Sequence, residues 1–253
     1  MPLAVDVPRL WLPPRPAIIR PARELWRPPV RLRFDQAFMP GITPVIAGAA
    51  AGKTIEFLGT SISTSNLTTY SFTSLDFGAA QDDRYIIGIP VSGTASRTLN
   101  SATIGGVTAR IVVQLSAGSA SNRQAGIIIA NLPTGTSGTI AVTWNNGCAH
   151  CAIGWWRATG LLSEVEHDFG SSSADPGTVT INTLAGGIAV AGMISASGGT
   201  FSWTGASERY DQAIGENSSV HSGADANTDG SALQISADDS GSNTARAFVA
   251  ASW

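Results

Sequence analysis

The residues best suited to binding a metal ion lie near the C-terminus, in the run Asp225-Ala-Asn227-Thr-Asp229-Gly230. Oxygen-bearing side chains at alternate positions, followed by a glycine, match the first six positions of a calcium-binding loop. Such a loop needs a bidentate glutamate at its twelfth position, where this chain has Ser236. The run therefore predicts either a calcium site on Asp225, Asn227 and Asp229, completed by a later acid, or an Asx-rich turn between strands.

Two thiols stand three positions apart, at Cys148 and Cys151, with His150 between them. They are the only cysteines of the chain, so no second pair is available to complete a four-ligand zinc site. Side chains three apart on a strand also point to opposite faces of the sheet. We therefore expect two buried free cysteines rather than a zinc or redox centre.

Acid–base chemistry has one candidate cluster, formed by Glu164, Glu166, His167 and Asp168 in the polar stretch 163–177. An acid and a base from this cluster could move protons, and paired carboxylates could cleave a glycoside. Solvated loop charges explain the cluster more simply. Neither G-x-S-x-G nor H-E-x-x-H occurs. We predict that the protein is not an enzyme and has no cofactor other than the calcium considered above.

Trp155 and Trp156 are adjacent on a predicted strand, so one ring is expected to face the core and the other the opposite surface. An outward tryptophan would offer a platform for sugar stacking or a contact between subunits. Packing within the sheet is the alternative.

The strongest compositional feature is an N-terminal arm, residues 1–44, which holds ten of the thirteen prolines. Proline fixes φ and restricts the preceding residue, which predicts extended polyproline II structure and turns. Basic and apolar side chains alternate with the prolines, and we expect them to dock on a partner: Arg9, Trp11, Arg15, Ile18, Ile19, Arg20, Arg23, Trp26, Arg27, Arg31, Arg33 and Phe34.

Charge divides the chain in the same place. The arm carries seven arginines and three acids, a net charge of +4, whereas the remainder carries eight basic and fifteen acidic residues, a net charge of −7. A basic arm on an acidic body indicates an acidic partner surface. Nucleic acid would also fit that sign, but the apolar residues between the arginines make it the weaker alternative. No stretch approaches the ~18 apolar residues of a membrane helix, so no membrane partner is expected.

Residues 45–53 are small and predict a hinge, and residues 54–253 predict an all-β body. Only 13% of the residues are charged, and short β-branched runs recur between Gly-, Ser- and Asn-containing turns. Thr69–Leu75 alternates as a half-buried strand does, and Asn146-Gly147 predicts a hairpin turn. We expect one domain, a jelly-roll-like β-sandwich of ten to thirteen strands, in which the stretch 163–177 carries the chain between sheets. A boundary between two lobes at this stretch is the alternative.

The arm PRLWLPPRPAIIRPA, reaching FMPG, and the Gly/Ser/Thr-rich body that closes on ARAFVAASW resemble small virion proteins of tailed bacteriophages and prophages. The resemblance covers nearly the whole chain. It implies a structural protein located in the virion, either decorating the capsid or associated with the tail. In such a protein the arm docks on other virion proteins, the sandwich is displayed, and homo-oligomers are expected. The alternative function is a carbohydrate-binding or host-recognition module that binds a host glycan, assisted by calcium.

Overall fold

A computed structural model describes residues 52–93, 96–117, 122–215, 218–241 and 245–253. The predicted arm and most of the predicted hinge lie outside these ranges. Within them the chain is all-β, as predicted, with seventeen strands rather than ten to thirteen. The described ranges contain no helix that could cross a membrane.

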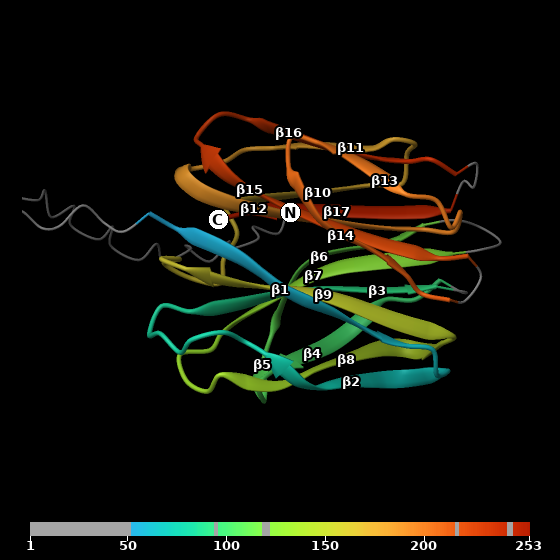
Figure 1. Ribbon diagram of the computed structural model, residues 1–253, viewed down its shortest axis with the longest axis horizontal. Coiled ribbons are helices and arrows are strands. Elements are labelled where there is room, and N and C mark those ends of the chain that lie inside the picture. The colour runs from blue at the N-terminus through green and yellow to red at the C-terminus, as the bar shows by residue number, and fades with distance from the viewer. Residues whose placement is uncertain (1–51, 94–95, 118–121, 216–217, 242–244) are drawn as a thin grey trace, which may run out of the picture. The chain divides into compact units, whose positions relative to one another are not determined.

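The strands form four sheets stacked as successive layers (Figure 1), numbered I to IV from the bottom of that view. Sheet I has the order β2 (Leu67–Asp76), β8 (Ser137–Cys148), β4 (Leu99–Ile104), β5 (Val107–Thr108). Sheet II has the order β1 (Thr54–Ser63), β9 (His150–Thr159), β3 (Tyr85–Gly93), β7 (Arg123–Asn131), β6 (Arg110–Ala117).

The second half of the chain forms the other two layers. Sheet III has the order β10 (Asp168–Ser172), β17 (Arg246–Ser252), β12 (Ala185–Ser195), β15 (Val220–Asp229), β14 (Ser207–Ala213). Sheet IV has the order β11 (Gly177–Ile181), β16 (Leu233–Asp239), β13 (Phe201–Thr204). Sheets I and II make one sandwich, here the N-sandwich, and sheets III and IV make a second, the C-sandwich. Residues 160–167 connect them, a linker that overlaps the start of the polar stretch 163–177.

Three separate cores fill the spaces between the four layers. Ile86, on β3, belongs to the core between sheets I and II, whereas its neighbour Ile87 belongs to the core between sheets II and III. The third core lies between sheets III and IV and contains Met193 and Phe248. Because both faces of sheets II and III are covered, their central strands need apolar residues at every position rather than at alternate ones. This requirement explains the unbroken burial of β3 and β17, and the burial of every residue of β9 except Arg157.

The outer sheets follow the opposite rule. On β2, Tyr70 and Phe72 are buried and Thr69 and Ser71 are exposed, which confirms the predicted alternation from Thr69 to Phe72. The alternation does not continue to Leu75, because Thr73 and Ser74 are both exposed and the pairing with β8 shifts register between Phe72 and Leu75. One face of this strand meets the core and the other meets solvent, so a period of two is sufficient.

Candidate functional site

Three segments that are distant in sequence lie at one end of the described body, here called the entry end. Strand β1 begins there at Thr54, the 160–167 linker passes from one sandwich to the other there, and the last residue, Trp253, lies there as well (Figure 1). Trp253 is held by backbone hydrogen bonds in both directions with Ile188, of 2.9 and 3.0 Å.

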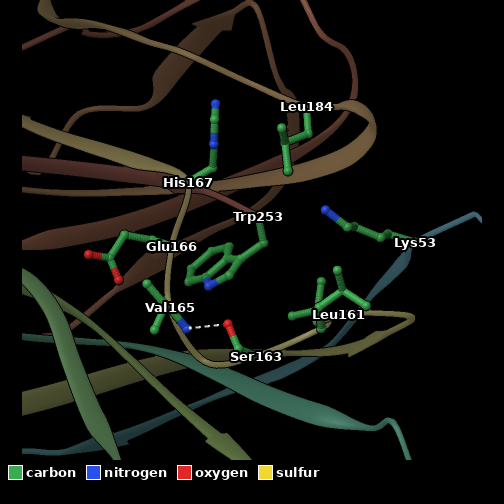
Figure 2. Close-up of a pocket in the computed structure, with 9 residues that line it drawn as sticks. Lys53, Leu161, Ser163, Val165, Glu166, His167, Leu184 and Trp253 are labelled. Carbon is green, nitrogen blue, oxygen red and sulfur yellow. Dashed lines mark hydrogen bonds between the residues drawn. The ribbon is translucent and has the colours of Figure 1, made fainter. Parts of the chain in front are cut away.

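A pocket of about 220 Å³ opens at the entry end (Figure 2). The indole of Trp253 forms its floor, with the ring nitrogen donating to the Glu164 carbonyl oxygen at 3.3 Å. Its other lining residues are Lys53, Leu161, Leu162, Ser163, Val165, Glu166, His167 and Leu184. The lining comes from the linker, from the residue before β1 and from the turn between β11 and β12, which lie far apart in sequence.

The linker carries apolar side chains on its outer surface. Leu162 is 97% exposed, Val165 is 59% exposed, and Leu184 is 41% exposed across the pocket. Phe169, at the start of β10, is 49% exposed. Apolar side chains clustered at the rim of a pocket are typical of a protein contact surface. The arrangement can accept an apolar side chain from a partner.

The acidic cluster of the linker has structural partners. Glu166 accepts two hydrogen bonds from the same guanidinium nitrogen of Arg110 on β6, at 2.7 and 2.9 Å. Glu164 accepts from the backbone N–H of Asn131 at 2.8 Å. These contacts fix the path of the linker against sheet II.

Asp168 has a similar role at the start of β10. It accepts from the backbone N–H and the side-chain amide of Asn182, at 2.8 and 2.9 Å. These hydrogen bonds stabilise the carboxylate and lower the pKa of Asp168 below its ordinary value.

The calcium interpretation of residues 225–230 is wrong for the described structure. Asp225, Asn227 and Asp229 lie on strand β15, which is extended and does not wrap around an ion. Asp225 is buried and its oxygens are already bound by Arg209 and by the indole nitrogen of Trp156. Across the described ranges, no three His, Cys, Asp or Glu side chains are grouped as metal ligands.

The expectation of an outward tryptophan on β9 is also wrong. Trp155 is 6% exposed and faces the core between sheets I and II, whereas Trp156 is fully buried between sheets II and III. The two rings do point to opposite faces, as a strand requires. Both faces are interior because a second sandwich covers the side that was expected to be surface.

Cys148 and Cys151 are buried free cysteines, as predicted. Burial raises the pKa of Cys151, which favours its protonated, unreactive form. His150 lies beside them, and neither of its ring nitrogens has a hydrogen-bond partner in the described part of the chain. Burial, with the nearby charge of Arg123, lowers the pKa of His150 to about 4.

A polar and aromatic cluster joins the two sandwiches, here called the latch. Arg209 and Asp225 form a two-bond ion pair with both bonds at 2.7 Å, and Asp225 also accepts from the Trp156 indole at 2.8 Å. The Tyr210 hydroxyl lies 2.8 Å from Nε2 of His221. The Tyr210 ring stacks on Phe57 of β1, with ring centroids 5.1 Å apart.

Burial has opposite effects on the two titratable rings of the latch. It lowers the pKa of His221 to about 3, because the charged imidazolium is poorly solvated there. It raises the pKa of Tyr210, because the phenolate is disfavoured for the same reason. Both groups are therefore neutral near pH 7. Sequence patterns gave no signal for the latch, because its members come from β1, β9, β14 and β15 and meet only when the sandwiches pack.

The twelve arm residues predicted to dock on a partner, from Arg9 to Phe34, lie outside the described residues. Comparisons of the chain with protein-family models, with curated proteins and with solved structures return no match.

Proposed function

We propose that the protein is a structural, non-enzymatic component of a tailed-phage virion, either decorating the capsid or accessory to the tail. In this proposal the arm docks on other virion proteins, and the two sandwiches are displayed from the particle. Homo-oligomers and a virion location belong to the same proposal.

The observation that supports it best is the position of the entry end. Strand β1, which follows the basic, proline-rich segment in sequence, begins at the end where exposed Leu162, Val165 and Leu184 surround the Trp253 pocket. A protein anchored to a particle needs its anchoring segment and its contact surface at the same end, so that the opposite end is free. Buried tryptophan and arginine anchors typically dominate binding energy at such interfaces, and the arm contains both residue types.

The fold is compatible with the proposal at the level of analogy. Most consecutive strands lie in opposite sheets of their sandwich, apart from the pairs β4–β5, β6–β7 and β14–β15. Such crossing between two sheets is typical of jelly rolls, which form viral capsid and lectin domains. One fold carries many functions, so this analogy favours no single one.

The test is incorporation into particles. Deletion of residues 1–40 is expected to leave a folded body with an unchanged thermal midpoint and to abolish its recovery in purified virions. In the full-length chain, the double change Trp11→Ala and Trp26→Ala is expected to reduce incorporation at least tenfold. Val107→Ala, which trims an exposed apolar residue of the body instead, is the matched control and should incorporate normally. Normal incorporation of the truncated chain would contradict the proposal.

Glycan recognition is the alternative, and the same jelly-roll connectivity is compatible with it. One reason to expect glycan binding is removed, because Trp155 and Trp156 are buried and neither ring can stack on a sugar. A glycan screen of the isolated body, with and without calcium, separates the two functions. Saturable binding to one glycan class would favour host recognition.

A further inference from the structure

The two sandwiches have the same topology. Sheet II has the order β1-β9-β3-β7-β6, and sheet III has the order β10-β17-β12-β15-β14. When β1 is matched to β10 and the chain is followed from there, every position of sheet III is occupied by the counterpart of a strand in sheet II. The outer sheets agree as well, since β2-β8-β4 corresponds to β11-β16-β13. Among the strands of the described ranges, the two-residue β5 alone has no counterpart.

Corresponding strands of sheets II and III also make corresponding contacts across the core between the two sheets. Strand β3 contacts its own counterpart β12 at the centre of the shared core. On one side β6 contacts β10, and on the other side their counterparts β14 and β1 meet through Tyr210 and Phe57. Likewise β7 contacts β17, while β15 and β9 meet through Asp225 and Trp156. These contacts are repeated with the roles of the two sandwiches exchanged, as in an isologous, two-fold interface. Among the described strands, the contacts of β6 with β17, of β7 with β12 and of β1 with β15 have no counterpart of similar extent, so the two-fold relation is approximate.

We propose that the chain is a covalently fused pair of one jelly-roll module, in which the inner five-stranded sheet of each module is an interaction surface for a second copy of the module. This inference does not depend on the proposed virion function. It assigns a partner to each inner sheet, namely the other half of the same chain, and it identifies the 160–167 linker as a tether rather than as part of either module.

The composition of the interface fits this assignment. Its core is apolar, with Ile87, Ile89, Val190, Ile194 and Val249 contributed from both sheets. Obligate dimer interfaces resemble a domain core cut in half, whereas contacts between loosely tethered domains are more polar. The latch adds directional contacts at one side of this apolar surface.

The test cuts the tether in the full-length protein. A recognition sequence for a site-specific protease is inserted beside Leu162, which is almost fully exposed. After cleavage, both fragments are expected to elute together at the volume of the uncut chain. Their unfolding midpoint is expected to fall on hundredfold dilution, as for a dimer, whereas the midpoint of the uncut chain should not move.

The matched control places the same recognition sequence in the exposed turn 230–232, between β15 and β16. A cut there divides a module internally, because β16 and β17 are separated from the rest of the C-sandwich. After unfolding and refolding, the linker-cut fragments are expected to recover the complex at least fivefold better than the turn-cut fragments. Separation or precipitation of the linker-cut halves, a midpoint that ignores dilution, or equal recovery from the two cuts would overturn the proposal.

Discussion

At the scale of single residues, Asp225 shows how a buried charge is tolerated between the sandwiches. Its carboxylate is 2% exposed, and it is compensated by the Arg209 guanidinium and the Trp156 indole. A buried ion pair adds little net stability, because desolvation offsets the attraction between the charges. Removing one partner is costly, since the remaining charge stays buried without compensation.

We therefore expect Arg209→Met to lower the free energy of unfolding by about 2–4 kcal/mol, measured by urea denaturation. The matched control is Glu56→Gln, which breaks the more exposed pair of Glu56 with Arg157 at 3.5 Å. Exposed pairs contribute about 1 kcal/mol or less, so the control should change stability little. Equal losses in the two variants would contradict a compensating role for Arg209.

The two buried imidazoles predict a stability that falls in mild acid. The pKa values of His150 and His221 in the folded chain, about 4 and about 3, lie below the ordinary value of 6.5. At pH values between the folded-chain pKa and 6.5, the unfolded chain binds more protons than the folded chain does. The free energy of unfolding therefore decreases as the pH falls below 6.5. Each imidazole should contribute a loss of about 2 kcal/mol between pH 7 and pH 5.

Thermal or urea unfolding at a series of pH values measures this dependence. His150→Leu is expected to remove about half of the slope between pH 7 and pH 5, whatever its effect on absolute stability. A wild-type stability that is flat over this range would show that the imidazoles are solvated.

At the scale of strands, two glycines make room for the ring of Tyr210. A Cβ at Gly154 of β9 would lie 2.2 Å from the Tyr210 hydroxyl oxygen, and one at Gly223 of β15 would lie 2.6 Å from a ring carbon. The ring therefore occupies space that any larger residue on either strand would need. Glycine within a strand commonly marks such a close approach.

Gly154→Ala is expected to displace Tyr210 and to destabilise the protein by about 1–3 kcal/mol, as overpacking typically does. Differential scanning calorimetry, with urea denaturation for the free energy, measures the loss. Gly52→Ala is the control, because no atom lies within 4 Å of the added Cβ. Combining Gly154→Ala with Tyr210→Leu should recover part of the loss, and an unchanged loss in the double variant would place the clash elsewhere.

Strand patterns also show what the sequence could and could not predict. The alternation from Thr69 to Phe72 identified β2 because one face of that strand meets solvent. The Asn146-Gly147 hairpin was wrong, since β8 continues through both residues to Cys148 and its successor β9 pairs in a different sheet. A turn signal describes local backbone preference, whereas the change of sheet depends on distant partners.

The candidate sites differ in the same way. The free state of Cys148 and Cys151 followed from their number. The argument from their spacing was wrong, because Cys148 ends β8 and Cys151 lies on β9, and both face the core between sheets I and II. Whether Trp156 is exposed, and whether Asp225 is free to bind an ion, depended on a second sandwich packing against the first. Two-sided burial produces continuous apolar runs, and such runs do not reveal how many layers cover a strand.

At the scale of the whole molecule, the arm and the body are expected to differ in their resistance to protease. Arg84, Arg123 and Arg246 of the body are buried, and most of its backbone is paired in sheets. The prolines of the arm remove backbone donors that strand pairing would need. Trypsin should therefore cut the isolated protein first after Arg9, Arg23, Arg31 or Arg33, none of which precedes a proline.

Mass spectrometry of a digestion time course identifies these cuts. The expected product is a resistant fragment that begins at Phe34, after Arg33, or at Thr54, after Lys53, because no lysine or arginine lies between Arg33 and Lys53. Adding purified particles should slow cleavage of the arm if the particles hold it. Protection of the arm in the isolated protein would contradict a docking role and would favour a self-contained module.

The shared pocket at the entry end has a consequence for the order of the chain. Lys53 and Trp253 line the same cavity, so the first and last segments of the body lie close together. Chains with neighbouring ends commonly tolerate circular permutation. A short glycine–serine bridge from Trp253 to Lys53, with new ends opened beside Leu162, would place the C-sandwich first in the sequence without moving a strand. The fold therefore does not require the N-sandwich to precede the C-sandwich in the sequence.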